Sequence, residues 1–138
     1  MSAGTIAPAH QVAAERAAAS PIDAYRVFHG TVPIGHGRML HLDGPIVLGP
    51  TDARGQVIGA LYLTDGSRAS VVGLVFGGGV SLRITTYSGR VLHAGGSGHL
   101  GRVAGGFPGY DALFGGGNLS PASGPFVIGK WHSSPPGS

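Results

Sequence analysis

The sequence predicts an all-β fold, a closed antiparallel β-barrel in a single domain. From Tyr25 onward, short apolar runs alternate with Gly, Pro, Asp and Ser, which is the spacing of strands and turns. The run Gln56–Thr64 is apolar at both parities, as expected where the two faces of a barrel strand are both covered. Charged residues make up only 11% of the 138 residues, too few for the outer faces of a helical bundle.

A leader is expected over residues 1–24, flexible or partly helical. The stretch His10–Ala19 is alanine-rich and favours a short helix, which Pro21 would end. The leader either frays or packs as an arm on a neighbouring subunit. The barrel domain is expected over residues 25–132, and residues 133–138 are expected to form a disordered tail.

Eight candidate strands follow one another through the barrel domain. The turn residues Asp65–Ser67 and Ser88–Gly89 predict hairpins between neighbouring strands. Glycines inside strands, at Gly59 and Gly73, are typical of sharp bends at barrel corners. The candidates are Tyr25–Val32, Arg38–Leu42, Gln56–Thr64, Ala69–Phe76, Ser81–Tyr87, Arg90–Ala94, Arg102–Phe107 and Pro125–Trp131.

A glycine-rich tract, Gly105–Gly124, interrupts the strand pattern. Long loops in compact domains are often functional, so the tract is either a packed surface loop or a lid over the barrel mouth. Near-helical spacing of its apolar residues predicts one apolar turn between glycine hinges. These residues are Phe107, Tyr110, Leu113 and Phe114.

Composition excludes several classes of function. No cysteine is present, which rules out disulfides and thiolate chemistry. The net charge of +3 reflects a scarcity of acids, and single, dispersed arginines do not form the basic stripe of a nucleic-acid reader. The apolar runs are too short for membrane-spanning helices or for the strands of a transmembrane barrel. We therefore expect a cytoplasmic protein with no nucleic-acid or membrane partner. We also expect a homo-oligomer, because sparse charge leaves apolar surface that a second subunit can cover.

Two catalytic motifs fail on their context. Gly96–Gly101 matches the GxGxxG dinucleotide fingerprint, but the following residues, RVAGGFP, cannot form the helix whose N-terminus holds a pyrophosphate. We therefore expect no nicotinamide cofactor. No G-x-S-x-G elbow occurs, because Gly95–Gly98 lacks the second spacing, and the serine-hydrolase elbow is excluded as well.

Histidines gather near the first strands, at His29, His36 and His41. A metal site would need three neutral imidazoles on one side. The pattern of cupin barrels also needs a glutamate, and none follows Glu15. We expect neither a metal nor another cofactor.

Three segments resemble the dirigent proteins and allene oxide cyclases. Gly95–Leu100 (GGSGHL), closing at Gly105, resembles their GG-S/T-G-x-F/L-…-G signature. Asp43–Pro50 (DGPIVLGP) resembles their D-x-P-…-GP segment. Leu74–Leu82 (LVFGGGVSL) resembles their LVF-x-x-G-…-L hairpin. The segments occur in family order between Asp43 and Gly105, a span of close to half the chain.

The resemblance implies an eight-stranded antiparallel barrel, often a dimer or trimer, with an apolar pocket along its axis. Members steer unsaturated intermediates to one stereochemical outcome, and similar bacterial barrels close rings in polyketides, including by Diels–Alder cycloaddition. For this chain it implies a cofactor-independent cyclase acting on a hydrophobic, polyketide-like intermediate. The alternative is a non-catalytic dirigent-type protein that orients such an intermediate. His99 and Ala104 replace a family acid and arginine, which puts a plant-type quinone-methide mechanism in doubt.

A ring-closing barrel needs mainly to hold a reactive conformer and to offer hydrogen-bond donors to a carbonyl. Tyr62 and Arg102 are candidate donors, and His93 is a candidate general base. For the aromatic candidates the ordinary alternative is core packing, and a barrel filled by side chains would favour a purely structural role. The substrate-binding candidates are Asp43, which matches the D-x-P acid, and Leu74, Phe76, Tyr87, Phe107, Tyr110 and Trp131.

Overall fold

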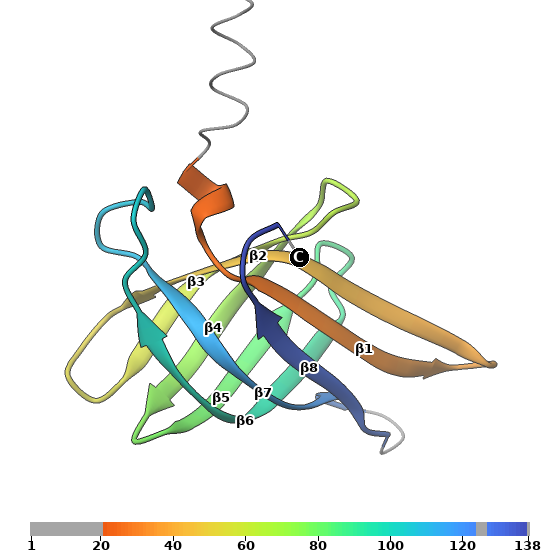
Figure 1. Cartoon of the computed structure of the whole chain (residues 1–138). Helices are drawn as coiled ribbons and strands as arrows, with labels where there is room; N and C mark the ends of the chain where they lie inside the picture. The colour runs from red at the N-terminus through yellow and green to blue at the C-terminus, as the bar shows by residue number, and fades with distance from the viewer. Residues whose placement is uncertain (1–20, 124–126, 138) are drawn as a thin grey trace, which may run out of the picture.

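The computed structural model describes residues 21–123 and 127–137, which form a closed barrel of eight antiparallel strands (Figure 1). The predicted fold is confirmed. Consecutive strands pair along the chain and β8 returns to β1. A short 3-10 helix, η1 (Pro21–Ala24), leads into the barrel, and the predicted helix His10–Ala19 lies outside the described residues. The strands are β1 (Val27–Gly35), β2 (Arg38–Pro50), β3 (Gln56–Tyr62), β4 (Arg68–Phe76), β5 (Gly79–Thr85), β6 (Val91–Gly101), β7 (Asp111–Pro121) and β8 (Gly129–Ser134).

Both predicted hairpins are confirmed, because Asp65–Ser67 connects β3 to β4 and Ser88–Gly89 connects β5 to β6. Gly59 and Gly73 lie where neighbouring strands approach each other closely. A Cβ at either position would collide with a backbone carbonyl of the adjacent strand. Within the described residues, no helix is long and apolar enough to cross a membrane.

Two predictions for the region after residue 100 are wrong. The segment Arg102–Phe107 is a loop rather than a strand, because β6 already ends at Gly101. The tract Gly105–Gly124 does not hold a helical turn, since β7 occupies most of it and Leu113 points into the core. Pairing between glycines explains both differences. Glycines let the backbones of β6 and β7 approach each other, whereas larger residues would keep the two strands apart.

These paired glycines form a glycine seam, which consists of Gly96 and Gly98 on β6 and Gly115 and Gly117 on β7. Gly96 pairs with Gly117, and Gly98 pairs with Gly115. A Cβ at any of the four would collide with the backbone of the opposite strand. The seam therefore depends on glycine at each position.

The barrel interior is filled by packed apolar side chains. Phe28 and Trp131, both almost fully buried, stack with ring centroids 5.3 Å apart and planes at 10°. The indole Nε1 of Trp131 donates a hydrogen bond to the carbonyl oxygen of Gly95 at 3.0 Å. Inward-facing residues of every strand complete the core, including Leu42, Ile46, Leu48, Leu61, Val71, Leu82, Ile84, Leu92, Leu113 and Leu119.

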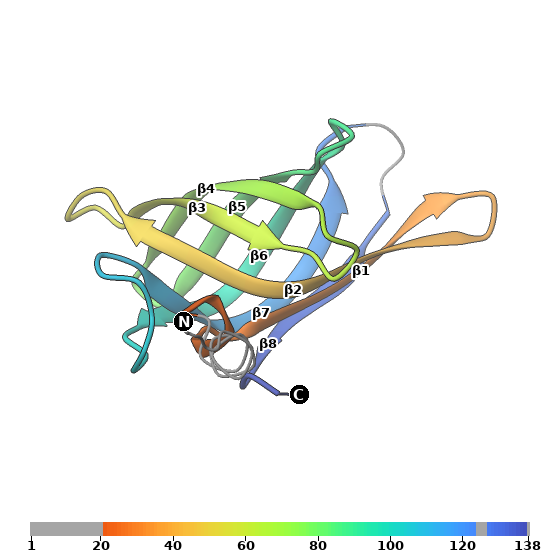
Figure 2. The same ribbon diagram turned by 90° about the horizontal axis from the view of Figure 1, so that it is seen from above.

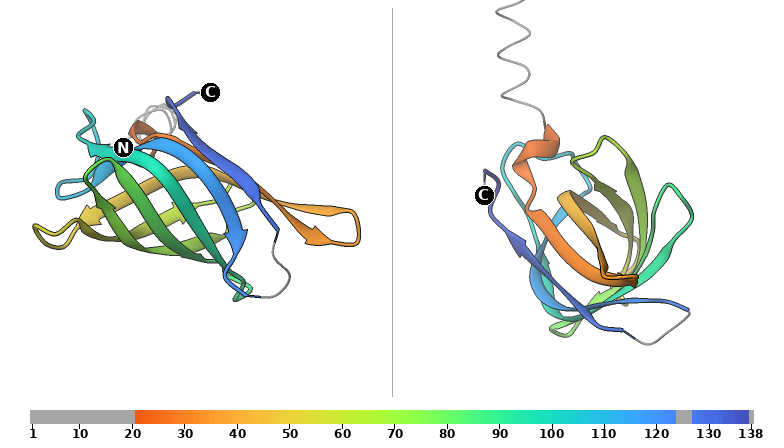
Figure 3. Two further views of the ribbon diagram at one scale, coloured as in Figure 1. Left: turned by 90° about the horizontal axis from the view of Figure 1, so that it is seen from below. Right: turned by 90° about the vertical axis from the view of Figure 1, so that its right-hand side faces the viewer.

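One end of the barrel is narrowed, because β2 and β7 pair directly at Val47 with Ala112. Figure 3 shows that the start of β1 and the end of β8 lie at this end. Ser133, which is buried there, accepts hydrogen bonds at Oγ from Arg26 Nε and from Gly115 N. β8 therefore runs through Ser133 and Ser134, two residues past the expected end of the barrel domain and into the expected disordered tail.

At the other end, the hairpin formed by β1 and β2 projects past its neighbours (Figure 2). β8 pairs with β1 only as far as Thr31, and β1 and β2 continue alone to their turn. His36, in that turn, has a positive φ of 58°. This places His36 away from the body of the barrel.

Replacing Asp65 with alanine should lower stability at neutral pH and have no effect in acid. Asp65 Oδ1 accepts hydrogen bonds from the Ser67 hydroxyl at 2.6 Å and from Ser67 N at 2.8 Å. These bonds, the hydroxyl's first, lower the pKa of Asp65. A carboxyl with a lowered folded-state pKa stabilises the fold above its unfolded pKa and loses this contribution as pH falls through the folded one. Urea midpoints across pH would measure this, and a difference that persists in acid would contradict it.

Candidate functional site

A pocket of about 510 Å³ lies on the outer face of the barrel, over β3 and β4. Its volume is within the range of small-molecule sites. The walls are mostly apolar, with a few polar groups. The lining residues are Val47, Ile58, Gly59, Ala60, Tyr62, Arg68, Ser70, Val72, Phe107 and Tyr110.

The floor of the pocket consists of three cross-strand residue pairs. Outward side chains alternate along each strand, so β3 contributes three residues and β4 contributes their partners. The pairs, from one end of the pocket to the other, are Tyr62 with Arg68, Ala60 with Ser70, and Ile58 with Val72. The floor is therefore polar at the Tyr62 end and apolar at the Ile58 end.

Two aromatic residues of the loop between β6 and β7 form a wall of the pocket. Phe107 and Tyr110 lie in an edge-to-face arrangement with ring centroids 6.5 Å apart. Tyr110 also packs over Gly49 of β2, where a Cβ would lie 3.2 Å from its ring. The first part of the tract that was expected to be either a packed surface loop or a lid over the barrel mouth is thus a loop that lies beside an external pocket.

Tyr25 holds this loop in place. Its side chain is fully buried and stacks on Phe107 with centroids 6.2 Å apart. The Tyr25 hydroxyl donates to the Phe107 carbonyl oxygen at 3.1 Å and accepts from Phe107 N at 2.5 Å. Two hydrogen bonds and a stacked ring therefore fix one wall of the pocket to the start of the barrel.

The structure brings together three of the predicted site residues, Tyr62, Phe107 and Tyr110. Arg102 lies in the loop after β6 and pairs with Asp111 at 3.2 Å, with most of its side chain in solvent. His93 points outward from β6 and bonds Ser81 Oγ at 3.0 Å. The three predicted catalytic residues therefore do not share a site.

The other substrate-binding candidates are dispersed. Trp131 lies in the core, and Tyr87, in the turn after β5, is 87% exposed. Leu74 and Phe76 are exposed on the outer face of β4. Leu74 lines a hollow of about 410 Å³ that shares Ile58 and Val72 with the pocket. Leu74 is thus a neighbour of the pocket rather than part of its wall.

The resemblance implies an apolar pocket along the barrel axis, but the pocket of ligand size lies on the outer face. The axis is occupied by the stacked rings of Phe28 and Trp131 and by the aliphatic core around them. The inward parity of β3 carries Val57 and Leu61, so Tyr62 faces outward. Filling of an eight-stranded barrel by its own side chains is common at this strand number.

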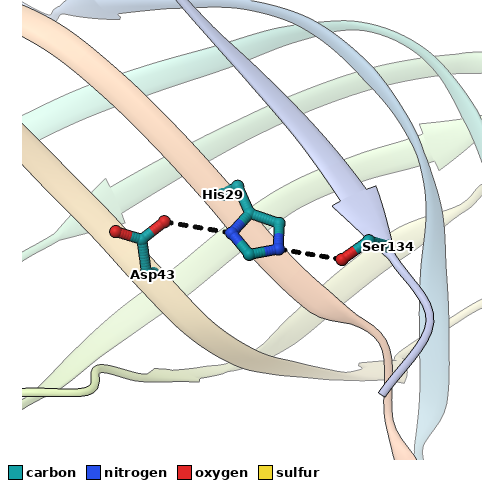
Figure 4. Close-up of polar contacts among 3 residues, drawn as sticks. All are labelled: His29, Asp43 and Ser134. Carbon is teal, nitrogen blue, oxygen red and sulfur yellow. Dashed lines mark hydrogen bonds and ion pairs between the residues drawn. The ribbon is translucent and has the colours of Figure 1, made fainter. Parts of the chain in front are cut away.

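His29, one of the three clustered histidines, makes two side-chain hydrogen bonds on the outer face of β1 (Figure 4). Its Nδ1 lies 3.1 Å from Asp43 Oδ1 on β2, and its Nε2 lies 2.8 Å from Ser134 Oγ on β8. His41 is exposed on β2 and His36 is in the hairpin turn. Among residues 21–123 and 127–137, no three His, Cys, Asp or Glu side chains form a group able to hold a metal ion.

Sequence reasoning missed Arg68 and Ser70 as lining residues of the pocket, and it missed Tyr25 as the residue that holds the aromatic wall. A local signal existed for the first two, because the Asp65–Ser67 turn fixes the register that places Arg68 opposite Tyr62. No local signal pointed to Tyr25, whose partner Phe107 is 82 residues away.

Comparison with protein-family models, with curated proteins and with solved structures found no match for this chain.

Proposed function

We propose that the protein binds a small, largely apolar and unsaturated molecule in the pocket over β3 and β4. The observation that carries this proposal is the gradation of the floor, from the polar pair Tyr62 and Arg68 to the apolar pair Ile58 and Val72. A few convergent polar groups in an apolar hollow are typical of ligand sites. This corresponds to the non-catalytic alternative of the sequence analysis, with the site moved to the outside of the barrel.

The lining residues define the ligand's chemistry. Phe107 and Tyr110 offer aromatic surfaces to a planar or polyene body. Tyr62 and Arg68 offer a hydroxyl and a guanidinium to an acceptor, either a carbonyl or a carboxylate. We therefore expect an elongated ligand with an oxygen acceptor at one end.

Anilinonaphthalene sulfonate is a suitable probe because it joins an aromatic body to an anionic acceptor. Its fluorescence should rise with the wild-type protein. Arg68→Gln and Phe107→Ala should each weaken binding roughly tenfold, which corresponds to about 1.4 kcal/mol. Arg83→Gln is the matched control, since Arg83 is an exposed strand arginine on β5 outside the pocket lining.

Equal affinity of all three variants for the probe would refute the pocket assignment. Sedimentation of the same samples separates binding from self-association. If the fluorescence of the bound probe is lost when the protein associates into a dimer or trimer, the apolar outer face serves assembly instead. The predicted homo-oligomer remains a proposal, supported by exposed Leu74 and Phe76 on β4.

Ring closure is a second candidate function, favoured by the pairing of Tyr62 with Arg68. Two donors on one carbonyl would polarise a dienophile, and the aromatic wall would restrict the chain to a reactive conformer. Purified protein with no added cofactor should then convert a linear triene carrying an enone faster than buffer does, and a chelator should not change the rate. Tyr62→Phe should slow conversion roughly tenfold, since removing one donor to a developing charge has effects of this order or larger. Equal rates with and without protein would exclude this activity.

A further inference from the structure

We propose that Ser134 is an activated nucleophile that accepts acyl groups from aryl esters, with His29 as its general base and Asp43 as the positioning residue. This site is separate from the pocket over β3 and β4. It rests on the hydrogen bonds that join the three residues and does not depend on the proposed ligand.

Three neighbouring strands bring these residues together on the outer face of the barrel (Figure 4). His29 on β1 lies directly opposite Asp43 on β2 and next to β8, which carries Ser134. The Ser134 Oγ to His29 Nε2 distance is 2.8 Å, and the His29 Nδ1 to Asp43 Oδ1 distance is 3.1 Å. A nucleophile bonded to a base, which is itself bonded to a third group, is the arrangement that activates a serine.

The proposed role of His29 uses one tautomer of its imidazole. In this tautomer Nδ1 carries the proton and donates a hydrogen bond to Asp43, since a carboxylate can only accept. His29 Nε2 is then free to accept the proton of the Ser134 hydroxyl. The ring of His132 stacks on His29 with centroids 5.0 Å apart, which restricts rotation of the imidazole. The His29 and Asp43 side chains are 28% and 37% exposed, so the cluster is open to a substrate.

The proposed reaction has two steps, acylation of Ser134 and hydrolysis of the acyl-serine. Ser134 Oγ forms a bond to the ester carbonyl carbon while its proton moves to His29 Nε2; the bond to the aryl oxygen then breaks, and the phenol leaves with that proton. The oxygen of a water molecule next forms a bond to the acyl carbon while one of its protons moves to His29 Nε2. The bond from the acyl carbon to Ser134 Oγ then breaks, Oγ takes the proton back from His29, and the carboxylic acid leaves.

The residues after Ser134 restrict the substrates. Pro135 and Pro136 have no backbone N–H with which to stabilise an oxyanion. The leaving group must therefore be a weak base, and aryl esters satisfy this whereas peptide bonds do not.

The chain contains its own control, the Ser81–His93 pair. Ser81 Oγ lies 3.0 Å from His93 Nε2, and both residues are exposed on β5 and β6. Within the described part of the chain, no carboxylate is hydrogen-bonded to His93, in contrast to His29. Of these two described serine–histidine pairs, the one with Ser134 has the full arrangement.

The test incubates the full chain with p-nitrophenyl acetate and locates the acetyl group by peptide mass spectrometry. The proposal expects one acetyl group on Ser134 and no modification of Ser81. Ser134→Ala should reduce nitrophenol release to the rate of the ester in buffer, and Ser81→Ala should leave the rate of nitrophenol release unchanged. Acetylation of the wild-type protein at Ser81 or at a lysine, with Ser134 unmodified, would be sufficient to overturn the proposal.

Asp43→Asn tests the positioning role. It should slow nitrophenol release at least about tenfold, because the amide no longer fixes the imidazole tautomer that serves as base. Asp43→Glu should recover part of the rate, and the urea midpoint serves as the measure of folding. A normal rate in folded Asp43→Asn would overturn the role. Binding of anilinonaphthalene sulfonate should not change in these variants, so failure here and failure of the pocket proposal are distinguishable.

Discussion

Replacing Trp131 with alanine should destabilise the barrel by about 3–5 kcal/mol, a large part of the stability of a domain of this size. The indole is 2% exposed, stacks on Phe28 and donates its N–H to the Gly95 carbonyl. Its removal leaves a cavity beside the Phe28 ring, and the Gly95 carbonyl oxygen loses this donor. A urea titration should show a lower midpoint at an unchanged slope.

Two further variants separate the loss of the hydrogen bond from the loss of packing and provide an exposed control. Trp131→Phe keeps most of the stacking and loses the hydrogen bond, so it should cost about 1–3 kcal/mol. Tyr87→Ala removes an exposed aromatic residue in a turn and should change stability by no more than about 0.5 kcal/mol. A stable Trp131→Ala protein that no longer binds the probe would instead make Trp131 a binding residue, as the sequence alone allowed.

Gly117→Ala should cost about 1–3 kcal/mol or more, although it adds a single methyl group. A Cβ at Gly117 would lie 2.7 Å from Gly96 Cα and would collide with the Gly95 carbonyl oxygen. Backbone atoms of a paired strand cannot rotate away as a side chain can, so β6 and β7 would have to separate along the glycine seam. Thermal unfolding and amide exchange of β6 would measure the loss.

The matched control is Gly79→Ala on β5. A Cβ there would make only an ordinary contact, 3.5 Å from the Phe76 carbonyl oxygen. This variant should be neutral or slightly stabilising, because alanine reduces the freedom of the unfolded chain. Equal losses of stability in Gly79→Ala and Gly117→Ala would show that the glycine seam does not require close approach of the β6 and β7 backbones.

The local features of the fold could be predicted from the sequence. Turn chemistry placed the Asp65–Ser67 and Ser88–Gly89 hairpins, since a turn depends on residues that are adjacent in the chain. β7 could not be predicted in this way. Three consecutive glycines, Gly115–Gly117, give no alternation of side chains, and the strand forms because a second glycine-rich strand lies against it.

The candidate sites were less predictable than the fold. Tyr62, Phe107 and Tyr110 were singled out by residue type, but their pocket depends on which face of β3 points outward. Asp43 and His29 were noted for a family motif and for metal binding, and Ser134 was assigned to a tail. Their hydrogen bonds join residues 14 and 105 positions apart, a distance that no local pattern covers.

A barrel of short strands joined by tight turns could be inferred from the order of the residues, because strand periodicity and turn chemistry act within a few residues. Which parity of each strand faces the axis could not be inferred in this way, since it depends on how the strands pack together. That choice depends on volume: the Phe28 ring fits inside the barrel because Gly30 has no side chain, since a Cβ there would lie 2.8 Å from the ring, and Trp131 stacks on Phe28. Once the large rings occupied the inside, Tyr62 and the Asp43, His29 and Ser134 side chains were left on the outer face, where both proposed activities lie.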